Sequence, residues 1–107
     1  MKEGTLYFKT AGTGGNAALL MPASNLLGVR MSAANRAQFE FRATNGNVKR
    51  TNCQVNYTGS FEELCKAISG ALNSNTMTVV ADEVDGVFLA FNGGVFTSIQ
   101  GVDDLTT

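Results

Sequence analysis

Histidine is absent from this 107-residue chain. The chain therefore lacks the commonest general base, the commonest side-chain metal ligand and every Ser-His or Cys-His nucleophile pair. The glycine-rich stretch 11–16 lacks the Lys-Ser/Thr of a P-loop, and the acidic stretch 82–86 lacks the ligand spacing of an EF-hand. We therefore predict that the protein is not an enzyme, with no catalytic residues, no cofactor, no metal site and no small-molecule substrate.

Charged residues are also scarce. Lys, Arg, Asp and Glu make up 16% of the chain, and the net charge is −1. The usual share is about a quarter of the residues. A protein with so little charge is poorly protected against association, which favours an oligomer in which part of the surface is buried. The alternative is a small, neutral domain rich in glycine and asparagine.

No run of about 18 apolar residues is present, so we expect no membrane-spanning helix. The stretch 1–10 already alternates between polar and apolar residues, unlike a secretory leader. We expect the protein in the cytoplasm of a host cell or in a virion, neither secreted nor in a membrane. In that setting Cys53 and Cys65 are expected to be reduced and buried, with a disulfide between them as the alternative.

The segment 60–83 predicts one helix that runs into a strand. Ser60 and Glu63 have the spacing of a capping box, which satisfies free N–H groups at a helix start. The run 73–75 is Asn-Ser-Asn, and asparagine tolerates the left-handed conformation that ends helices. Apolar residues at spacings of three and four form one stripe: Phe61, Leu64, Cys65, Ile68 and Leu72. We therefore predict a single amphipathic helix over about 60–73 that covers a sheet.

Short alternating segments before and after the helix predict strands joined by Gly and Asn turns. The apolar segment 87–91 is expected to be buried on both faces, and the acidic tail 101–107 to be loose. The other strands are expected at 5–10, 17–21, 26–32, 37–43, directly after the Asn45-Gly46 turn, at 76–81 and at 95–100. The pattern predicts a single mostly β domain of the α+β class over 1–107. Its architecture is a small, strongly bent antiparallel sheet or a partly open barrel with one covering helix.

The Asn45-Gly46 pair is the strongest short hairpin signal in the chain. A two-residue turn there would put Cys53 and Phe39 on opposite faces of the hairpin, because a one-residue slip reverses every side chain. A three-residue loop that includes the next residue pairs Phe39 with Cys53 and keeps both in the core. We prefer this second register, although it places Arg42 opposite Arg50.

The charges divide unevenly along the chain. Residues 1–56 contain seven basic and two acidic side chains, a net +5, and residues 57–107 contain one basic and seven acidic, a net −6. If the halves form different faces, identical subunits can pack head to tail. A basic face can also bind a phosphate backbone, with Arg36, Arg42, Lys49 and Arg50 as the candidates. The alternative is scattered surface charge that averages out in three dimensions.

The segments LLMPASNLLGVRM (19–31) and SFEELCKAISGALNSNTMTVVADE (60–83), with a strand and a hairpin between them, resemble small uncharacterised proteins in marine bacteriophage genomes. Those proteins share a short N-terminal strand, a PASxLxG element, a polar hairpin and a helix that leads into a VVAD-type strand. The resemblance implies a small virion-associated or structural protein without enzymatic activity.

The segment VFTSIQGVDDL (95–105) resembles the second Sm motif of Sm-like RNA-binding rings, in which an Ile-Arg-Gly step ends a strand. The corresponding residues are Ile99, Gln100 and Gly101, so Gln100 replaces the arginine that stacks on a base. The first Sm motif has no counterpart here. We therefore expect a phage-like, non-catalytic structural or assembly protein that forms a homo-oligomer. The alternative is an Sm-like ring that binds RNA through a basic face.

Overall fold

The computed structural model describes residues 4–11, 18–42 and 50–105, the last three of these by their backbone alone. Within them it confirms the mostly β, α+β class, with one α-helix. The elements in chain order are β1 (Thr5–Lys9), β2 (Ala18–Pro22), the short 3-10 turn η1 (Ala23–Asn25), β3 (Leu26–Ala33), β4 (Arg36–Arg42), β5 (Arg50–Thr58), α1 (Phe61–Leu72), β6 (Met77–Asp82), β7 (Val87–Phe88), β8 (Ala90–Phe91) and β9 (Gly94–Leu105).

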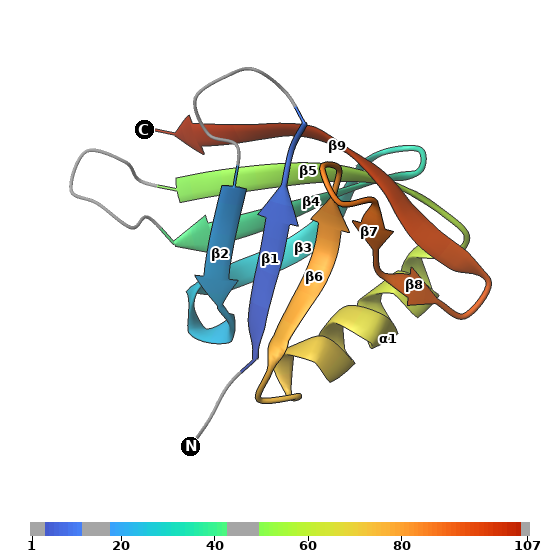
Figure 1. Cartoon of the computed structure of the whole chain (residues 1–107), viewed down its shortest axis with the longest axis horizontal. Coiled ribbons are helices and arrows are strands. Elements are labelled where there is room, and N and C mark those ends of the chain that lie inside the picture. Colours follow the sequence, from blue (N-terminus) through green and yellow to red (C-terminus); the bar gives the residue numbers. More distant parts are fainter. Residues whose placement is uncertain (1–3, 12–17, 43–49, 106–107) are drawn as a thin grey trace.

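The strands form two sheets, one in front of the other in Figure 1. Sheet A has the order β2-β1-β6-β7, and sheet B has the order β3-β4-β5-β9-β8. Sheet B is antiparallel and curls into a half-barrel, which confirms the predicted bent sheet or partly open barrel. Sheet A adds a feature that the sequence pattern did not indicate, because β1 and β6 pair in parallel.

The core lies between the sheets and the helix. Phe8 of sheet A meets Phe39 and Phe41 of sheet B, with ring centroids 5.2 and 5.9 Å apart in edge-to-face geometry. Such pairs add about 0.5–1.5 kcal/mol beyond the burial of their area. The core also contains Leu6, Met21, Ala37, Cys53, Val55, Tyr57, Leu64, Ile68, Ala71, Val80, Ala81 and Phe96. The phenylalanines therefore hold the two sheets together directly.

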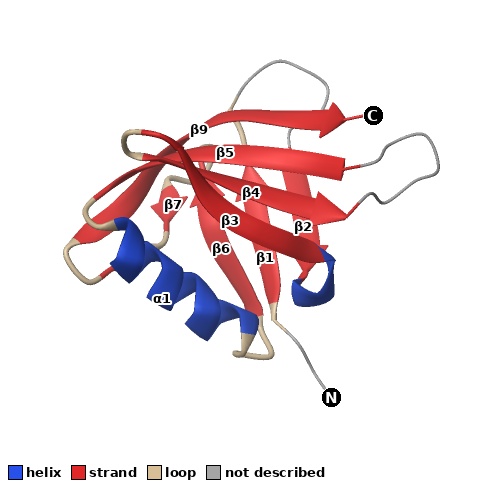
Figure 2. Cartoon of the chain, turned by 180° about the vertical axis from the view of Figure 1, so that it is seen from behind, coloured by secondary structure: helices blue, strands red, loops and turns tan. Residues whose placement is uncertain are grey.

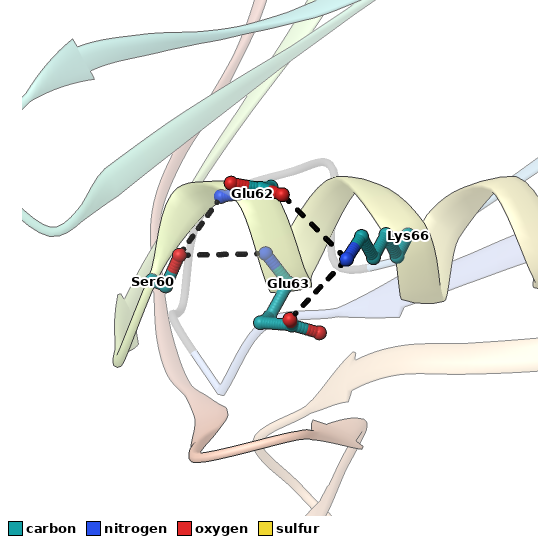
Figure 3. A network of polar contacts seen from close by, with 4 residues as sticks. All are labelled: Ser60, Glu62, Glu63 and Lys66. Atoms are coloured by element: carbon teal, nitrogen blue, oxygen red, sulfur yellow. Dashed lines mark hydrogen bonds and ion pairs between the residues drawn. The ribbon is translucent and has the colours of Figure 1, made fainter.

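Helix α1 begins and ends where the sequence predicts. The Ser60 hydroxyl accepts hydrogen bonds from the backbone N–H groups of Glu62 (3.2 Å) and Glu63 (3.5 Å), as Figure 3 shows. Lys66 Nζ lies 3.5 Å from a carboxylate oxygen of each of these glutamates. At the other end, the N–H of Gly4 donates to the Leu72 carbonyl (3.0 Å). The end of the helix is thereby fixed to the start of sheet A.

The hairpin between β4 and β5 has the predicted three-residue register. Phe39 is opposite Cys53, and Arg42 is opposite Arg50. The Asn45-Gly46 turn itself lies outside the described residues. Both cysteines are free, as expected, with Cys53 buried and Cys65 partly buried.

The segment 87–91 is not the single strand, buried on both faces, that its composition predicts. β7 pairs with β6 in sheet A, whereas β8 pairs with β9 in sheet B. Leu89 joins them, because its N–H donates to Val80 and its carbonyl accepts from Phe96, both at 3.0 Å. Val87 is 49% exposed. The segment is apolar because it connects the two sheets, with Phe88, Leu89 and Phe91 packed against the core.

The prediction of a loose tail is wrong for residues 101–105. β9 continues to Leu105, which is opposite Arg50, while Asp103 is opposite Asn52. The backbone of this acidic segment is therefore paired with β5 along the end of β9. Residues 106–107 lie outside the described part of the chain.

Candidate interaction faces

The outer face of sheet B collects polar side chains from neighbouring strands and includes most of the basic residues singled out in the sequence. Figure 2 shows this sheet from its outer side. Strand alternation places polar residues opposite the buried phenylalanines, on the side away from the core. We call this surface the polar face: Arg30, Arg36, Gln38, Glu40, Arg42, Arg50, Asn52, Gln54, Asn56, Ser98 and Gln100.

Glu40 lies in the middle of the polar face and contacts two arginines. Its Oε1 is 3.5 Å from Arg30 Nε, and its Oε2 is 3.4 Å from Arg50 Nη1. Gln38 donates to the same carboxylate at 3.1 Å. Exposed ion pairs of this kind each contribute about 0–1 kcal/mol, so their main effect is on the surface potential. Glu40 lowers the positive potential that the predicted basic face requires.

A second group of contacts joins Arg36, a candidate residue of the basic face, to Gln100, the middle residue of the Sm-like step. Arg36 Nε donates to Asn56 Oδ1 at 3.2 Å. Asn56 Nδ2 in turn donates to Ser98 Oγ at 2.9 Å and lies 3.5 Å from Gln100 Oε1. The polar face therefore satisfies many of its own donors and acceptors.

The remaining predicted site residues are less closely connected. Arg42 is exposed at the end of β4, and Lys49 lies outside the described residues. Gln54 pairs with Gly101 and the next residue of β5 pairs with Ile99, so Gln100 is the extra residue of a β-bulge. The step Ile99-Gln100-Gly101 thus bends β9 without ending it, whereas the Sm-like pattern places a strand end there.

The bulge in β9 is held by Glu83, which the sequence analysis placed only in an acidic turn. One carboxylate oxygen accepts from the Ile99 N–H, and the other accepts from the Ala11 N–H, both at 3.0 Å. Glu83 also donates its own N–H to the Lys9 carbonyl (2.9 Å). A single side chain therefore links the end of β1 to β9. Its partners are distant in sequence, so no local signal reveals this role.

The neighbouring acid is also engaged by the backbone. Asp82 is buried, and its Oδ1 accepts from the N–H groups of Val84 and Asp85 at 3.0 Å. In the described part of the chain, no three Cys, Asp or Glu side chains are grouped so as to hold a metal ion. The Asp82 carboxylate thereby stabilises the turn that follows β6.

Burial makes both thiols weakly acidic. Burial raises the pKa of the Cys53 thiol to about 12, and it also raises the pKa of Cys65 above its ordinary value. The thiolate is the nucleophilic form of cysteine. Neither side chain is therefore prepared for nucleophilic chemistry at neutral pH.

The outer face of sheet A differs, because it is mostly apolar. Tyr7 lies between Leu20 on β2 and Val79 on β6 in one row across the sheet. In the next row Thr5 lies between Pro22 and Met77. Leu20 and Met77 are each 55% exposed. We call this surface the apolar face: Tyr7, Leu20, Pro22, Met77, Val79 and Val87.

Figure 1 shows sheet A nearest to the viewer, with α1 below it.

Among the described residues, no helix is long and apolar enough to cross a membrane. No protein-family model, curated protein or solved structure matches this chain. The two outer faces are therefore the features from which a function is inferred.

Proposed function

We propose that the protein is a non-catalytic structural subunit that acts by associating with further copies of itself. The apolar face supports this proposal: Leu20 and Met77 are about half exposed in the rows of Tyr7 and Thr5, and Val87 is about half exposed on β7, opposite Asp82. Clustered apolar side chains on an outer surface are typical of interaction sites. An apolar surface complements a second copy of itself, and the charged Lys9 lies in the next row of the sheet, between Ala18 and Asp82.

The resemblance to marine phage proteins supports a structural or virion-associated role within this proposal. Its first segment, 19–31, contains most of β2 and six of the eight residues of β3. Leu20 and Pro22 of that segment belong to the apolar face. The resembling residues and the proposed contact surface therefore coincide in part.

The charge division along the chain gives less support to head-to-tail packing. In sheet B the acidic segment is paired with the basic one, since Asp103 and Asp104 occupy positions opposite Asn52 and Thr51, next to Arg50. Residues from the basic half of the sequence and from its acidic half therefore lie side by side on β5 and β9. We therefore base self-association on apolar contact, which salt does not weaken.

The alternative of an Sm-like ring that binds RNA draws on one observation. Arg42 and Arg50 lie opposite each other at one end of the polar face. Under this alternative, Arg42→Ala lowers RNA affinity and flattens its salt dependence, because one phosphate contact is lost. RNA binding at low salt no stronger than that of a neutral control protein would exclude it.

The test of self-association is the solution mass, measured by light scattering behind a sizing column at low and high salt. We expect the wild-type chain to exceed the monomer mass at both salts, and Leu20→Lys with Met77→Lys to reduce that mass at least twofold. Val84→Lys is the matched control, because Val84 is also about half exposed (56%) but lies in a turn. A wild-type monomer at all concentrations contradicts the proposal.

A further inference from the structure

We infer that the free edge of sheet B is a second contact site between copies, where the β3 strands of two chains pair antiparallel around Val29. This joins the two five-stranded sheets into one. The inference rests on the proposed function, because it assumes that the protein associates with itself, and it names a surface separate from the apolar face.

β3 is one of two long free edges in the described structure. It has eight residues, whereas the edge strand β2 has five, and β7 and β8 have two each. The outer side of β9 also lacks a strand partner beyond Phe96, but the Ile99 N–H on that stretch bonds to Glu83. β2 also ends in Pro22, which lacks a backbone N–H. Six of the eight β3 residues are exposed. Figure 2 shows β3 as the outermost strand of sheet B. The pairing of β3 with β4 is irregular between Leu26 and Gly28 and between Met31 and Ala33, so the regular part of this edge is 28–31, centred on Val29 and Arg30. An open edge of this kind is a template for strand addition.

The edge is also open in its backbone. The N–H of Leu26 bonds to the Ala23 carbonyl at the corner with η1. For residues 27–33 the backbone hydrogen bonds among described residues are those made to β4 on the other side. The outward N–H and C=O groups of this segment are therefore available to an incoming strand.

Two-fold symmetry restricts how β3 can pair with its own copy. Residues directly opposite in an antiparallel pair point to the same side of the sheet, so one residue must face its own counterpart. Pairing around Arg30 places two guanidinium groups opposite each other. Pairing around Val29 instead places Leu27 opposite Met31 of the other copy. Leu27 and Met31 are 50% and 56% exposed, so this register covers two apolar side chains on each subunit.

The same register provides complementary charge on the outer side of the sheet. Gly28 faces Arg30 of the other copy, and Gly28 is itself opposite Glu40 on β4. A Cβ on Gly28 would meet nothing within 4 Å, so the space above it is open. Two strand spacings amount to about 10 Å between the backbones, a span that extended Arg and Glu side chains bridge. Glu40 of each chain, which already contacts Arg30 and Arg50 of its own chain, can therefore also bind Arg30 of its partner across Gly28.

The experiment is oxidative cross-linking of Val29→Cys in a Cys65→Ala background. Opposite residues have Cα atoms about 4.5–5.5 Å apart, within disulfide reach. Met31→Cys is the matched control, because the two copies of residue 31 are offset by four positions, about 14 Å along the strands, beyond the limit of about 7 Å. We expect at least tenfold more reducible dimer from Val29→Cys than from Met31→Cys. Equal yields, or none, overturn the inference.

The charge contact is tested in the same assay. Arg30→Glu places two acids across Gly28, and we expect it to lower the cross-linked fraction several-fold. Arg30→Glu with Glu40→Arg restores opposite charges and is expected to recover the yield. A single variant without effect, or a double variant without recovery, contradicts the ion pair across Gly28.

Failure here can be separated from failure of the proposed function. If Leu20→Lys with Met77→Lys lowers the mass but Val29→Cys gives no dimer, the apolar face stands and the edge contact is overturned. If Val29→Cys cross-links in a background that carries Leu20→Lys and Met77→Lys, the edge acts as a separate site. A monomeric wild type without cross-linking overturns both.

Discussion

The outer faces of the two sheets differ, although both sheets cover the same core. On sheet B, the outward side chains bond to one another: Glu40 to Arg30 and Arg50, and Asn56 to Arg36. On sheet A, outward residues such as Leu20 and Met77 have apolar neighbours and are half exposed. The inward residues of both sheets are apolar and buried, so they explain the fold but do not distinguish the two sheets. Information about partners therefore comes from the outer residues.

The difference also separates two kinds of energy. Polar contacts on sheet B contribute to the stability of the single chain, because their partners lie in the same chain. Apolar groups on sheet A gain about 25 cal/mol per Å² only when another surface removes them from water. Changes on the polar face away from the β3 edge should therefore alter unfolding, and changes on the apolar face should alter association.

The largest effect is expected from the contact that both sheets share. Phe8→Ala removes the ring between Phe39 and Phe41, and we expect it to lower the free energy of unfolding by about 3–5 kcal/mol. Both outer faces depend on that packing, so the variant should lose association as well. Urea unfolding followed by circular dichroism measures the loss. A change below about 1 kcal/mol would show that the sheets do not pack through this residue.

The next effect is expected at the link between sheet A and β9. Glu83→Ala leaves the N–H groups of Ile99 and Ala11 without their acceptor. Because these are charge-assisted hydrogen bonds on a partly buried carboxylate, we expect a loss of about 1–3 kcal/mol. Asp85→Ala is the control, since that side chain is exposed in the same turn. Equal losses in both variants would assign the effect to the turn and not to the link.

Glu83 also shows where the sequence stops being informative. Alternation is a local property, and it correctly predicted the buried face of β4 and the pairing of Phe39 with Cys53. The role of Glu83 depends on Ile99 in a bulge of β9 and on Ala11 after β1, which are brought together only by the fold. No pattern within a short window contains that information.

The same reasoning explains the two errors in the strand assignments. The apolar composition of 87–91 predicts burial. A strand buried inside one sheet and a segment that connects two sheets have the same apolar pattern, so composition alone does not distinguish them. The acidic residues of 101–105 suggest a free tail, and only their pairing with β5 shows otherwise. Arg36, Arg42 and Arg50 lie on the outer side of the sheet, whereas Lys49 lies outside the described residues. The contact of Glu40 with Arg50, and with Arg30, depends on tertiary geometry that no local pattern contains.

Cys53, on the inner side of β5, provides a pH-dependent test of the core that both faces cover. Burial raises the pKa of Cys53 to about 12 from its ordinary value of 9.0. The folded state thus keeps the proton that the unfolded state loses, so stability is fully present below about pH 9 and falls as the pH rises towards 12. The expected slope is up to about 1.4 kcal/mol per pH unit.

Urea unfolding between pH 8 and 11 measures that slope, with Cys53→Val as the comparison because it removes the titrating group. We expect the free energy of unfolding to fall more steeply with rising pH in the wild type than in Cys53→Val. If the free energy of unfolding falls equally steeply with pH in both proteins, a group other than Cys53 causes the loss of stability at alkaline pH.

The smallest effect is expected on the polar face. It tests most directly whether contacts on this face contribute to stability and contacts on the apolar face contribute to association. Asn56→Ala removes the acceptor of Arg36 and the donor to Ser98. Both groups remain partly accessible to water, so we expect a loss of about 0.5–1.5 kcal/mol in the free energy of unfolding. The solution mass should not change, because the lost bonds are internal to one chain. Leu20→Lys should do the reverse, with stability within about 0.5 kcal/mol of the wild type and a lower mass. If Asn56→Ala dissociates the protein while Leu20→Lys does not, the polar face is the contact surface and the assignment of the two faces must be exchanged.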